Sequence, residues 1–157
     1  MSEAAAHRLK AVALDPDGLS GASAEVEHER RVAIYDLIEE NAFRPAGADG
    51  GPYDLTLGLR DNRLQMEVVG PDYRRGHVLS LSPLRGVIKD YHLICESYLQ
   101  AVRGASSVQI EAVDMGRRGL HDEGARILRE RLEGKVEMDH ETSRRLFTLV
   151  CALSRRG

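Results

Sequence analysis

The sequence predicts a single α+β domain over residues 1–157, in which an antiparallel β-meander packs on a central helix and further helices follow at the C-terminal end. Three observations indicate this fold class. Apolar and polar residues alternate along 53–60 and 63–68, as in strands with one wet face. An apolar stripe of helical period runs along 82–103, and helical patterns fill most of 106–153. Residues 1–7 are expected to form a flexible tail.

The N-terminal third predicts one strand, one helix and one loop. Residues 8–15 are expected to form a short strand with Leu9, Ala11 and Ala13 on one face, ending at a Pro and Gly turn. Ser23 is expected to cap a helix that runs to about Asn41, with acidic residues in its first turns. Residues 43–52 hold two prolines and three glycines, which predicts a loop.

The sequence also predicts which residues of the meander strands lie opposite each other. If Asp61 and Asn62 form a two-residue turn, every large apolar side chain falls on one face of the sheet. The expected cross-strand pairs are Leu59 with Leu64, Leu57 with Met66, and Leu55 with Val68. A third strand is predicted at 77–81, directly before the next helix.

The helix over 82–103 is predicted to begin with Ser82 as its cap and Pro83 in its first turn. Its broad stripe predicts a central core helix; the stripe consists of Leu84, Val87, Ile88, Tyr91, Ile94, Cys95, Tyr98, Leu99 and Val102. A second set of residues, which includes His92 and Glu96, borders the stripe and is expected to face solvent or a shallow groove. Leu93 points away from the stripe.

The segment 106–134 is predicted to be helical but interrupted. Its three glycines, Gly116, Gly119 and Gly124, together disfavour one continuous exposed helix by about 3 kcal/mol relative to alanine. Either the helix breaks near Gly119 or it packs closely there. A last helix over 140–153 is predicted with Asp139 as its cap.

Composition excludes some classes of protein. The net charge of −3 and the absence of Trp disfavour a generally basic nucleic-acid binder or a protein held to acidic membranes. No stretch of the sequence is apolar enough to span a bilayer, so no membrane partner is expected and the predicted location is the cytoplasm. Cys95 and Cys151 are expected to be buried thiols.

Two pairs of residues could carry chemistry. His92 and Glu96 lie one helical turn apart, and His121 and Asp122 are adjacent in the glycine-rich segment. If the pairs meet across a groove, they suit a small metal-dependent enzyme or hydrolase in which a carboxylate orients an imidazole. They are candidates for catalysis only. The sequence leaves open whether the protein is an enzyme and whether it uses a cofactor, and it assigns no metal site.

A binding role has candidates of its own. Arg117 and Arg118 could fork onto phosphate or carboxylate, and with His121 they form the candidate binding segment within Met115–Gly124. Arginine outnumbers lysine 19 to 3 and recurs as adjacent pairs, which suits RNA phosphates. Acidic neighbours are expected to occupy many of these arginines, so RNA is an alternative partner and is not favoured.

Five long blocks of the sequence are similar to one known family. They are VEHERRVAIYDLIEEN, GGPYDLTLGLRDNRL, LSLSPLRGVIKDYHLICESYLQAVR, IEAVDMGRRGLHDEGARILRERLEGKVEMD and RRLFTLVCAL. Together they resemble uncharacterised protein family 0262 of the UPF series, small proteins of alphaproteobacteria. The resemblance implies a bacterial cytosolic setting and brings no activity, cofactor or catalytic residue.

The leading hypothesis is therefore a bacterial cytosolic, non-catalytic protein. It is expected to bind an unidentified protein partner, or a second copy of itself, through its arginine-bearing helices and the segment around Gly116–Gly124.

Overall fold

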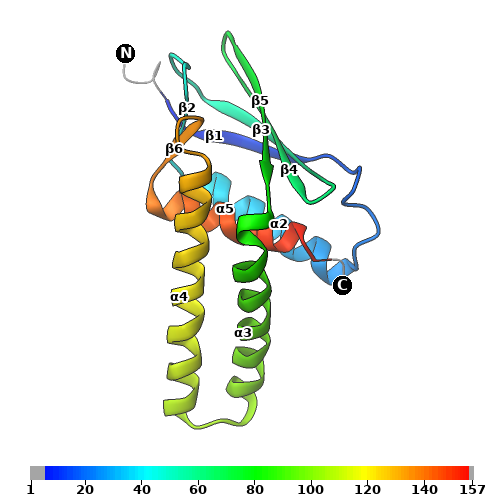
Figure 1. The fold of residues 1–157 in the computed structure, drawn as a ribbon, viewed down its shortest axis with the longest axis vertical. Coiled ribbons are helices and arrows are strands. Elements are labelled where there is room, and N and C mark those ends of the chain that lie inside the picture. Colours follow the sequence, from blue (N-terminus) through cyan, green and yellow to red (C-terminus); the bar gives the residue numbers. More distant parts are fainter. Residues whose placement is uncertain (1–5, 156–157) are drawn as a thin grey trace.

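The structure, a computed structural model, describes residues 6–155. Its main sheet has the strand order β1-β3-β4-β5, formed by β1 (Leu9–Leu14), β3 (Tyr53–Arg60), β4 (Arg63–Gly70) and β5 (Tyr73–Ser80). The last three strands form the antiparallel meander, and β1 pairs with β3 in parallel. The predicted α+β class is confirmed (Figure 1).

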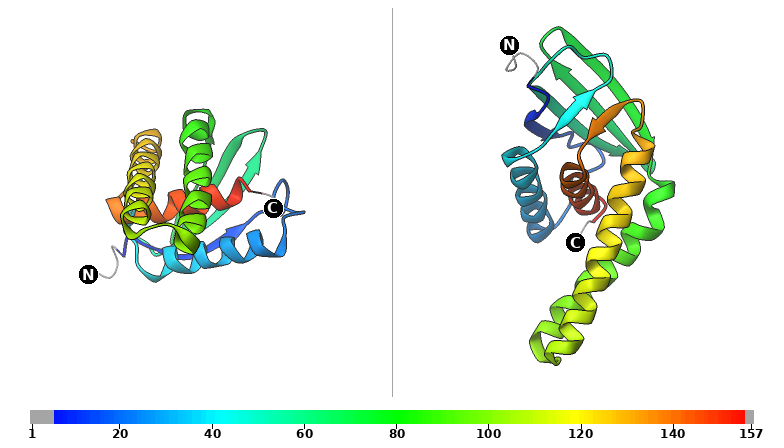
Figure 2. Two further views of the ribbon diagram at one scale, coloured as in Figure 1. Left: turned by 90° about the horizontal axis from the view of Figure 1, so that it is seen from below. Right: turned by 90° about the vertical axis from the view of Figure 1, so that its left-hand side faces the viewer.

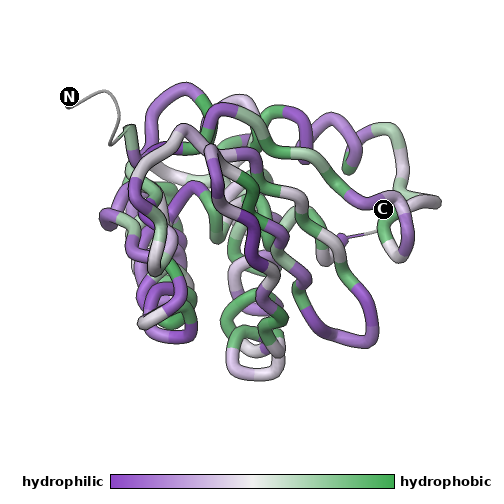
Figure 3. The backbone as a smooth tube through the Cα atoms, turned by 90° about the horizontal axis from the view of Figure 1, so that it is seen from above, coloured by the Kyte–Doolittle hydropathy of each residue, from purple (hydrophilic) through white to green (hydrophobic). Residues whose placement is uncertain are grey.

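The predicted register of the first hairpin is also confirmed. Leu59 lies opposite Leu64, Leu57 opposite Met66, and Leu55 opposite Val68. Asp61 and Asn62 both have positive φ, 52° and 60°, as a two-residue turn that matches the strand twist requires. The six apolar side chains are buried or nearly so, and more exposed residues alternate with them along the two strands. Figure 3 shows hydrophobic and hydrophilic residues following each other along the backbone. The third strand is longer than predicted and begins at Tyr73, because Pro71 and Asp72 form another tight turn.

Strand β1 confirms the predicted strand but corrects its inward face. A register shift lies between Leu9 and Ala11. After this irregularity Val12 and Leu14 turn toward the core, while Ala11 and Ala13 are exposed. One additional residue exchanges the two faces of a strand, which simple alternation cannot anticipate. Residues 1–5 of the expected tail lie outside the described residues, and His7 bonds the Tyr53 hydroxyl through Nδ1 at 2.7 Å.

The expected loop over 43–52 was partly wrong. Residues Phe43–Pro45 form β2, which pairs antiparallel with β6 (Val136–Met138) in a separate two-stranded sheet. Phe43 and Pro45 are buried, and Ala46 N continues the ladder by donating to Lys135 O. Each strand has three residues, too few for a visible alternation, and the partner lies far away in the sequence.

Helices α2 (Ala24–Glu39) and α5 (His140–Leu153) pack against each other on one face of the sheet (Figures 1 and 2). The predicted caps are confirmed: Ser23 accepts from Val26 N, and Asp139 accepts from Thr142 N. Nine residues of α5 are buried, more than in any other described helix. Helix α5 therefore occupies the centre that the sequence suggested for 82–103.

The segment 82–103 instead forms the base and first limb of a protruding hairpin. It contains the short 3₁₀ helix η1 (Ser82–Leu84) and α3 (Arg85–Gly104), and α4 (Ser107–Arg131) returns beside α3. Ser82 does not cap α3, because the turn begins as a 3₁₀ helix and no side-chain cap is present. We call residues 85–131 the arm; it extends away from the sheet in Figures 1 and 2.

Burial along the arm is confined to its base. Val87 and Ile88 are buried at the start of α3, and Gly124, Ala125 and Leu128 near the end of α4. No side chain from 89 to 123 is buried, so the predicted core stripe is covered by α4 on one side only. Helical period detects an apolar face, but it does not show what covers that face.

Helix α4 is continuous, so the alternative of a break near Gly119 was wrong. Close packing occurs instead at two other glycines. A Cβ on Gly124 would lie 2.2 Å from the buried Phe147 ring, and one on Gly116 would lie 2.7 Å from Ile94 Cδ1. Gly119 has open space around it. The close contact with Phe147 explains why a glycine, which disfavours a helix, stands at position 124.

Candidate functional site

A groove lies between α2, α3 and the C-terminal half of α5, with a volume of about 430 Å³. Its floor is formed by Thr148, Cys151 and Ala152 of α5. Its two walls come from α2 and α3, where the most exposed apolar side chains are Val32 and Leu99, 45% and 61% exposed. We call this depression the α2–α3–α5 groove; it is an open surface feature with an apolar interior.

Carboxylates lie on both walls of the groove. Asp36 on α2 and Glu96 on α3 are exposed, and neither forms an ion pair with a described basic side chain. Glu29 differs, because its carboxylate is paired with the guanidinium of Arg155. The rim of the groove is therefore acidic.

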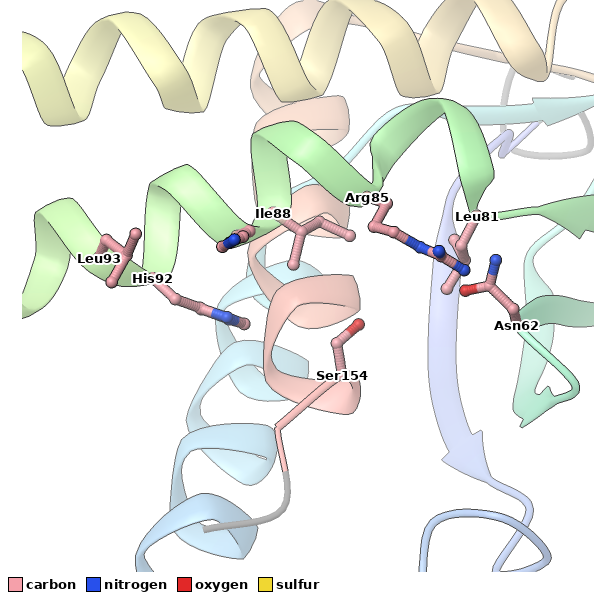
Figure 4. A pocket seen from close by; sticks show the side chains of 8 residues that line it. Asn62, Leu81, Arg85, Ile88, His92, Leu93 and Ser154 are labelled. Atoms are coloured by element: carbon pink, nitrogen blue, oxygen red, sulfur yellow. The ribbon is translucent and has the colours of Figure 1, made fainter.

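His92 lines the groove and is held by the end of α5. Its Nε2 donates to Cys151 O at 3.1 Å, and the ring is partly buried. Burial lowers the pKa of His92 below its usual value of 6.5, because charging the ring would cost desolvation. The same side chain borders a second, shallower hollow of about 340 Å³, where it lies near Ser154 (Figure 4). This agrees with the predicted border of solvent or a shallow groove.

His121 lies in a different place, between α4 and α5. Its Nδ1 accepts a hydrogen bond from Arg144 Nε at 3.2 Å, so the proton of the neutral ring sits on Nε2. That atom lies 2.8 Å from Thr148 Oγ1 and 3.0 Å from Arg144 O. The ring also stacks on Tyr91, with centroids 5.4 Å apart. Both nitrogens of His121 are thus bound to protein groups.

Asp122 points to the outer side of the same helix pair. Its Oδ1 lies 3.3 Å from His140 Nε2 and 3.4 Å from Arg144 Nε. His92 and Glu96 line the α2–α3–α5 groove, whereas His121 and Asp122 do not. The two pairs therefore do not share this cavity, and within residues 6–155 no three His, Cys, Asp or Glu side chains are placed to hold a metal ion.

The predicted binding segment Met115–Gly124 is part of α4 and not a loop. Arg117 is directed into the arm, where it pairs with Asp114 and lies 4.3 Å from the Tyr98 ring centroid. Arg118 also pairs with Asp114, at 3.0 Å, but its side chain is 70% exposed. Of the three residues proposed for binding, Arg118 is the one presented to solvent, while Arg117 and His121 bind within the arm and its base.

Comparisons with known proteins place the chain in one family. The sequence profile described as "Uncharacterised protein family (UPF0262)" matches residues 6–156. The chain belongs to UPF0262. A UPF0262 protein of Phenylobacterium zucineum is 58% identical over 151 residues, covering 96% of this chain and 95% of that protein. One from Azorhizobium caulinodans is 57% identical over 155 residues, covering 96% of each chain. No solved structure matches.

The arginine pairs of this UPF0262 chain are dispersed over its surface and interior. Arg74 pairs with Glu67, Arg144 with Asp122, and Arg155 with Glu29. Arg30 is buried, whereas its neighbour Arg31 is exposed. These pairs lie on different strands and helices, and their acidic partners agree with the expected surface pairing. In each of these pairs at least one described arginine is therefore buried or already paired with a carboxylate.

Two further features of the UPF0262 chain concern its cysteines and the apolar character of its helices. Cys151 is buried, as predicted, but Cys95 is only partly buried and lines the groove; both thiols are free. Among residues 6–155, no helix has the length and apolar character that crossing a bilayer requires.

Sequence reasoning missed the wall that α2 contributes to the groove. Val32 and Asp36 are ordinary residues of a surface helix, and no motif marks them. Leu99 was assigned to a core stripe. The apolar character of Leu99 could have indicated a contact surface. Its exposure could not be predicted, because it depends on where α3 leaves the body of the UPF0262 fold.

The two histidines predict a pH-dependent stability. Burial lowers the folded-state pKa of His92 and of His121, and at His121 the Arg144 guanidinium adds to the effect. The unfolded chain therefore binds more protons, so the free energy of unfolding should fall as pH drops below about 6.5. Urea unfolding at pH 7.5 and 5.5 measures this. The double variant His92→Gln/His121→Gln should show a smaller decrease, and a wild-type stability that rises toward pH 5.5 would contradict the assignment.

Proposed function

We propose that this UPF0262 protein is a cytoplasmic, non-catalytic protein that binds a macromolecular partner through its arm. The proposal rests on the large apolar side chains that are exposed along residues 89–123 of the arm, where no side chain is buried. The exposed fractions are 61% for Leu99, 53% for Val102, 75% for Val108 and 68% for Met115. Several such side chains on one protruding element are typical of a protein interaction site.

The chemistry of the candidate residues supports binding over catalysis. His121 has both ring nitrogens bound to protein groups, and Arg117 is paired with Asp114. His121 therefore offers no free ring nitrogen, and neither His121 nor Asp122 lines the groove that holds His92 and Glu96. Arg118 lies on the exposed surface of α4 and could contribute a charged contact to the partner. The free thiols suit a reducing compartment such as the cytoplasm.

Affinity capture with matched variants tests the proposal. The immobilised protein is exposed to a lysate of Caulobacter vibrioides, which has a UPF0262 protein 58% identical to this one. The bait variant Val108→Glu places a charge on the apolar end of the arm. We expect recovery of the partner to fall at least about fivefold, as for loss of an interface contact worth more than 1 kcal/mol.

The control is Val78→Glu, which changes a side chain that is 58% exposed on β5, outside the arm. It should recover the same partner as the wild type. Native mass spectrometry of the baits identifies a second copy as the partner if a wild-type dimer becomes monomeric in Val108→Glu. Equal capture by all three baits, with no change of mass, would exclude the apolar surface around Val108 as the binding element.

A further inference from the structure

The α2–α3–α5 groove has the form of a site for an additional helix. Its floor is α5, and its walls are α2 on one side and the arm on the other; the right-hand view in Figure 2 shows α2 and α5 side by side with the arm beyond α5. Val32 and Leu99 present apolar groups from opposite walls. An amphipathic helix that lies in such a groove buries its apolar stripe against residues of this kind.

The charge on the rim indicates which amphipathic helix fits. Asp36 and Glu96 stand on opposite walls and have no described basic partner, whereas the charge of Glu29 is matched by Arg155. A helix with Lys or Arg on both sides of its apolar stripe would pair with both carboxylates. A helix with acidic flanks would meet like charges, which disfavours binding.

The same charges disfavour a second copy of this chain as the occupant. If the two-fold axis of a symmetric dimer passed through the groove, the groove of one copy would meet the groove of the other. That arrangement would bring the two acidic rims together. The groove is therefore better suited to a different chain with basic flanks.

We propose that the α2–α3–α5 groove binds an amphipathic helix of a partner protein, with an aliphatic stripe flanked by basic residues. The inference rests on the proposed function and adds the position and chemistry of the partner segment. The aliphatic stripe contacts Val32, Leu99 and the α5 floor, and the basic flanks contact Asp36 and Glu96.

Two designed helical peptides of about 16 residues test this chemistry directly. They share one leucine stripe; one carries Lys flanks and the other Glu flanks. Fluorescence anisotropy of the labelled peptides measures their binding to the full-length protein. We expect the Lys-flanked peptide to bind saturably and the Glu-flanked peptide to bind at least about tenfold more weakly. In Asp36→Lys/Glu96→Lys the preference should reverse.

The matched control is Glu111→Lys/Glu123→Lys. It makes the same change in net charge at two exposed positions of α4 that do not line the groove. This control should keep the wild-type preference for the Lys-flanked peptide. Equal binding of both peptides to the wild-type protein overturns the inference, as does a preference that survives in Asp36→Lys/Glu96→Lys. A wild-type dimer that dissociates in Val32→Glu also overturns it, because a second copy would then occupy the groove.

The two proposals can fail separately. If Val108→Glu loses the captured partner and Asp36→Lys/Glu96→Lys retains it, the arm binds the partner and the groove inference is wrong. If the peptides discriminate as expected but Val108→Glu captures the partner as well as the wild type does, the groove inference stands and the part of the arm around Val108 does not contact the partner.

Discussion

Replacing Arg30 by alanine should lower the free energy of unfolding by about 3 to 5 kcal/mol. Arg30 is 4% exposed although it lies on a surface helix. Its guanidinium donates to Leu19 O and to three carbonyls at the end of α5, those of Ala152, Leu153 and Arg155. The last carbonyls of a helix have few partners within the helix, so the variant would remove side-chain donors from buried acceptors, of which Ala152 O would keep only backbone donors.

Urea unfolding followed by circular dichroism measures this effect. Arg30→Lys keeps the charge but loses the planar fork, and it should be intermediate in stability. The control is Arg31→Ala, at the adjacent exposed position, which should change stability by no more than about 0.5 kcal/mol. If Arg30→Ala and Arg31→Ala have the same stability, Arg30 does not hold the end of α5 in place.

The second large effect is expected at Gly124. Alanine has a higher helix propensity than glycine, so Gly124→Ala would stabilise an exposed helix by about 1 kcal/mol. Here the new methyl group would lie 2.2 Å from the buried ring of Phe147. The ring is enclosed and cannot move aside without disturbing its neighbours. We expect Gly124→Ala to lower the free energy of unfolding by about 1 to 3 kcal/mol.

Gly119 provides the opposite result in the same helix. It is exposed, and nothing lies within 4 Å of an added Cβ. Gly119→Ala should therefore raise the free energy of unfolding by about 0.5 to 1 kcal/mol. Thermal unfolding of the two variants gives the comparison. Shifts of the same sign would mean that the contact between Gly124 and Phe147 does not determine the stability of α4.

The elements that could be predicted from the sequence are those specified by nearby residues. The Asp61–Asn62 turn determines the register of β3 and β4, and Ser23 and Asp139 each bond an amide three residues ahead. The pairing of β1 with β3 could not be predicted in this way, because it joins strands separated by α2 and β2. The same is true of β2 and β6, which lie nearly a hundred residues apart.

In the candidate site, too, local features could be predicted from the sequence and contacts between distant segments could not. The sequence placed His92 and Glu96 correctly at the border of an apolar helix face that meets a groove. It could not show that His92 bonds the end of α5, or that His121 faces Arg144 on another side of that helix. Distance between two segments depends on how helices cross, and the crossing of α3 and α5 leaves no trace in the period of either helix. The glycines of α4 illustrate this as well, since only Gly124 meets Phe147.

The position of α5 also has a consequence for synthesis on the ribosome. Helix α5 is the most buried of the helices described here, and 139 residues precede it. At the usual 5 to 20 residues per second, translation of those residues takes roughly 7 to 30 s. During that interval Leu57, Met66 and Leu37 lack the helix that completes their hydrophobic core. The nascent chain therefore presents an uncovered sheet face, to which a chaperone that recognises exposed apolar segments has access before α5 docks.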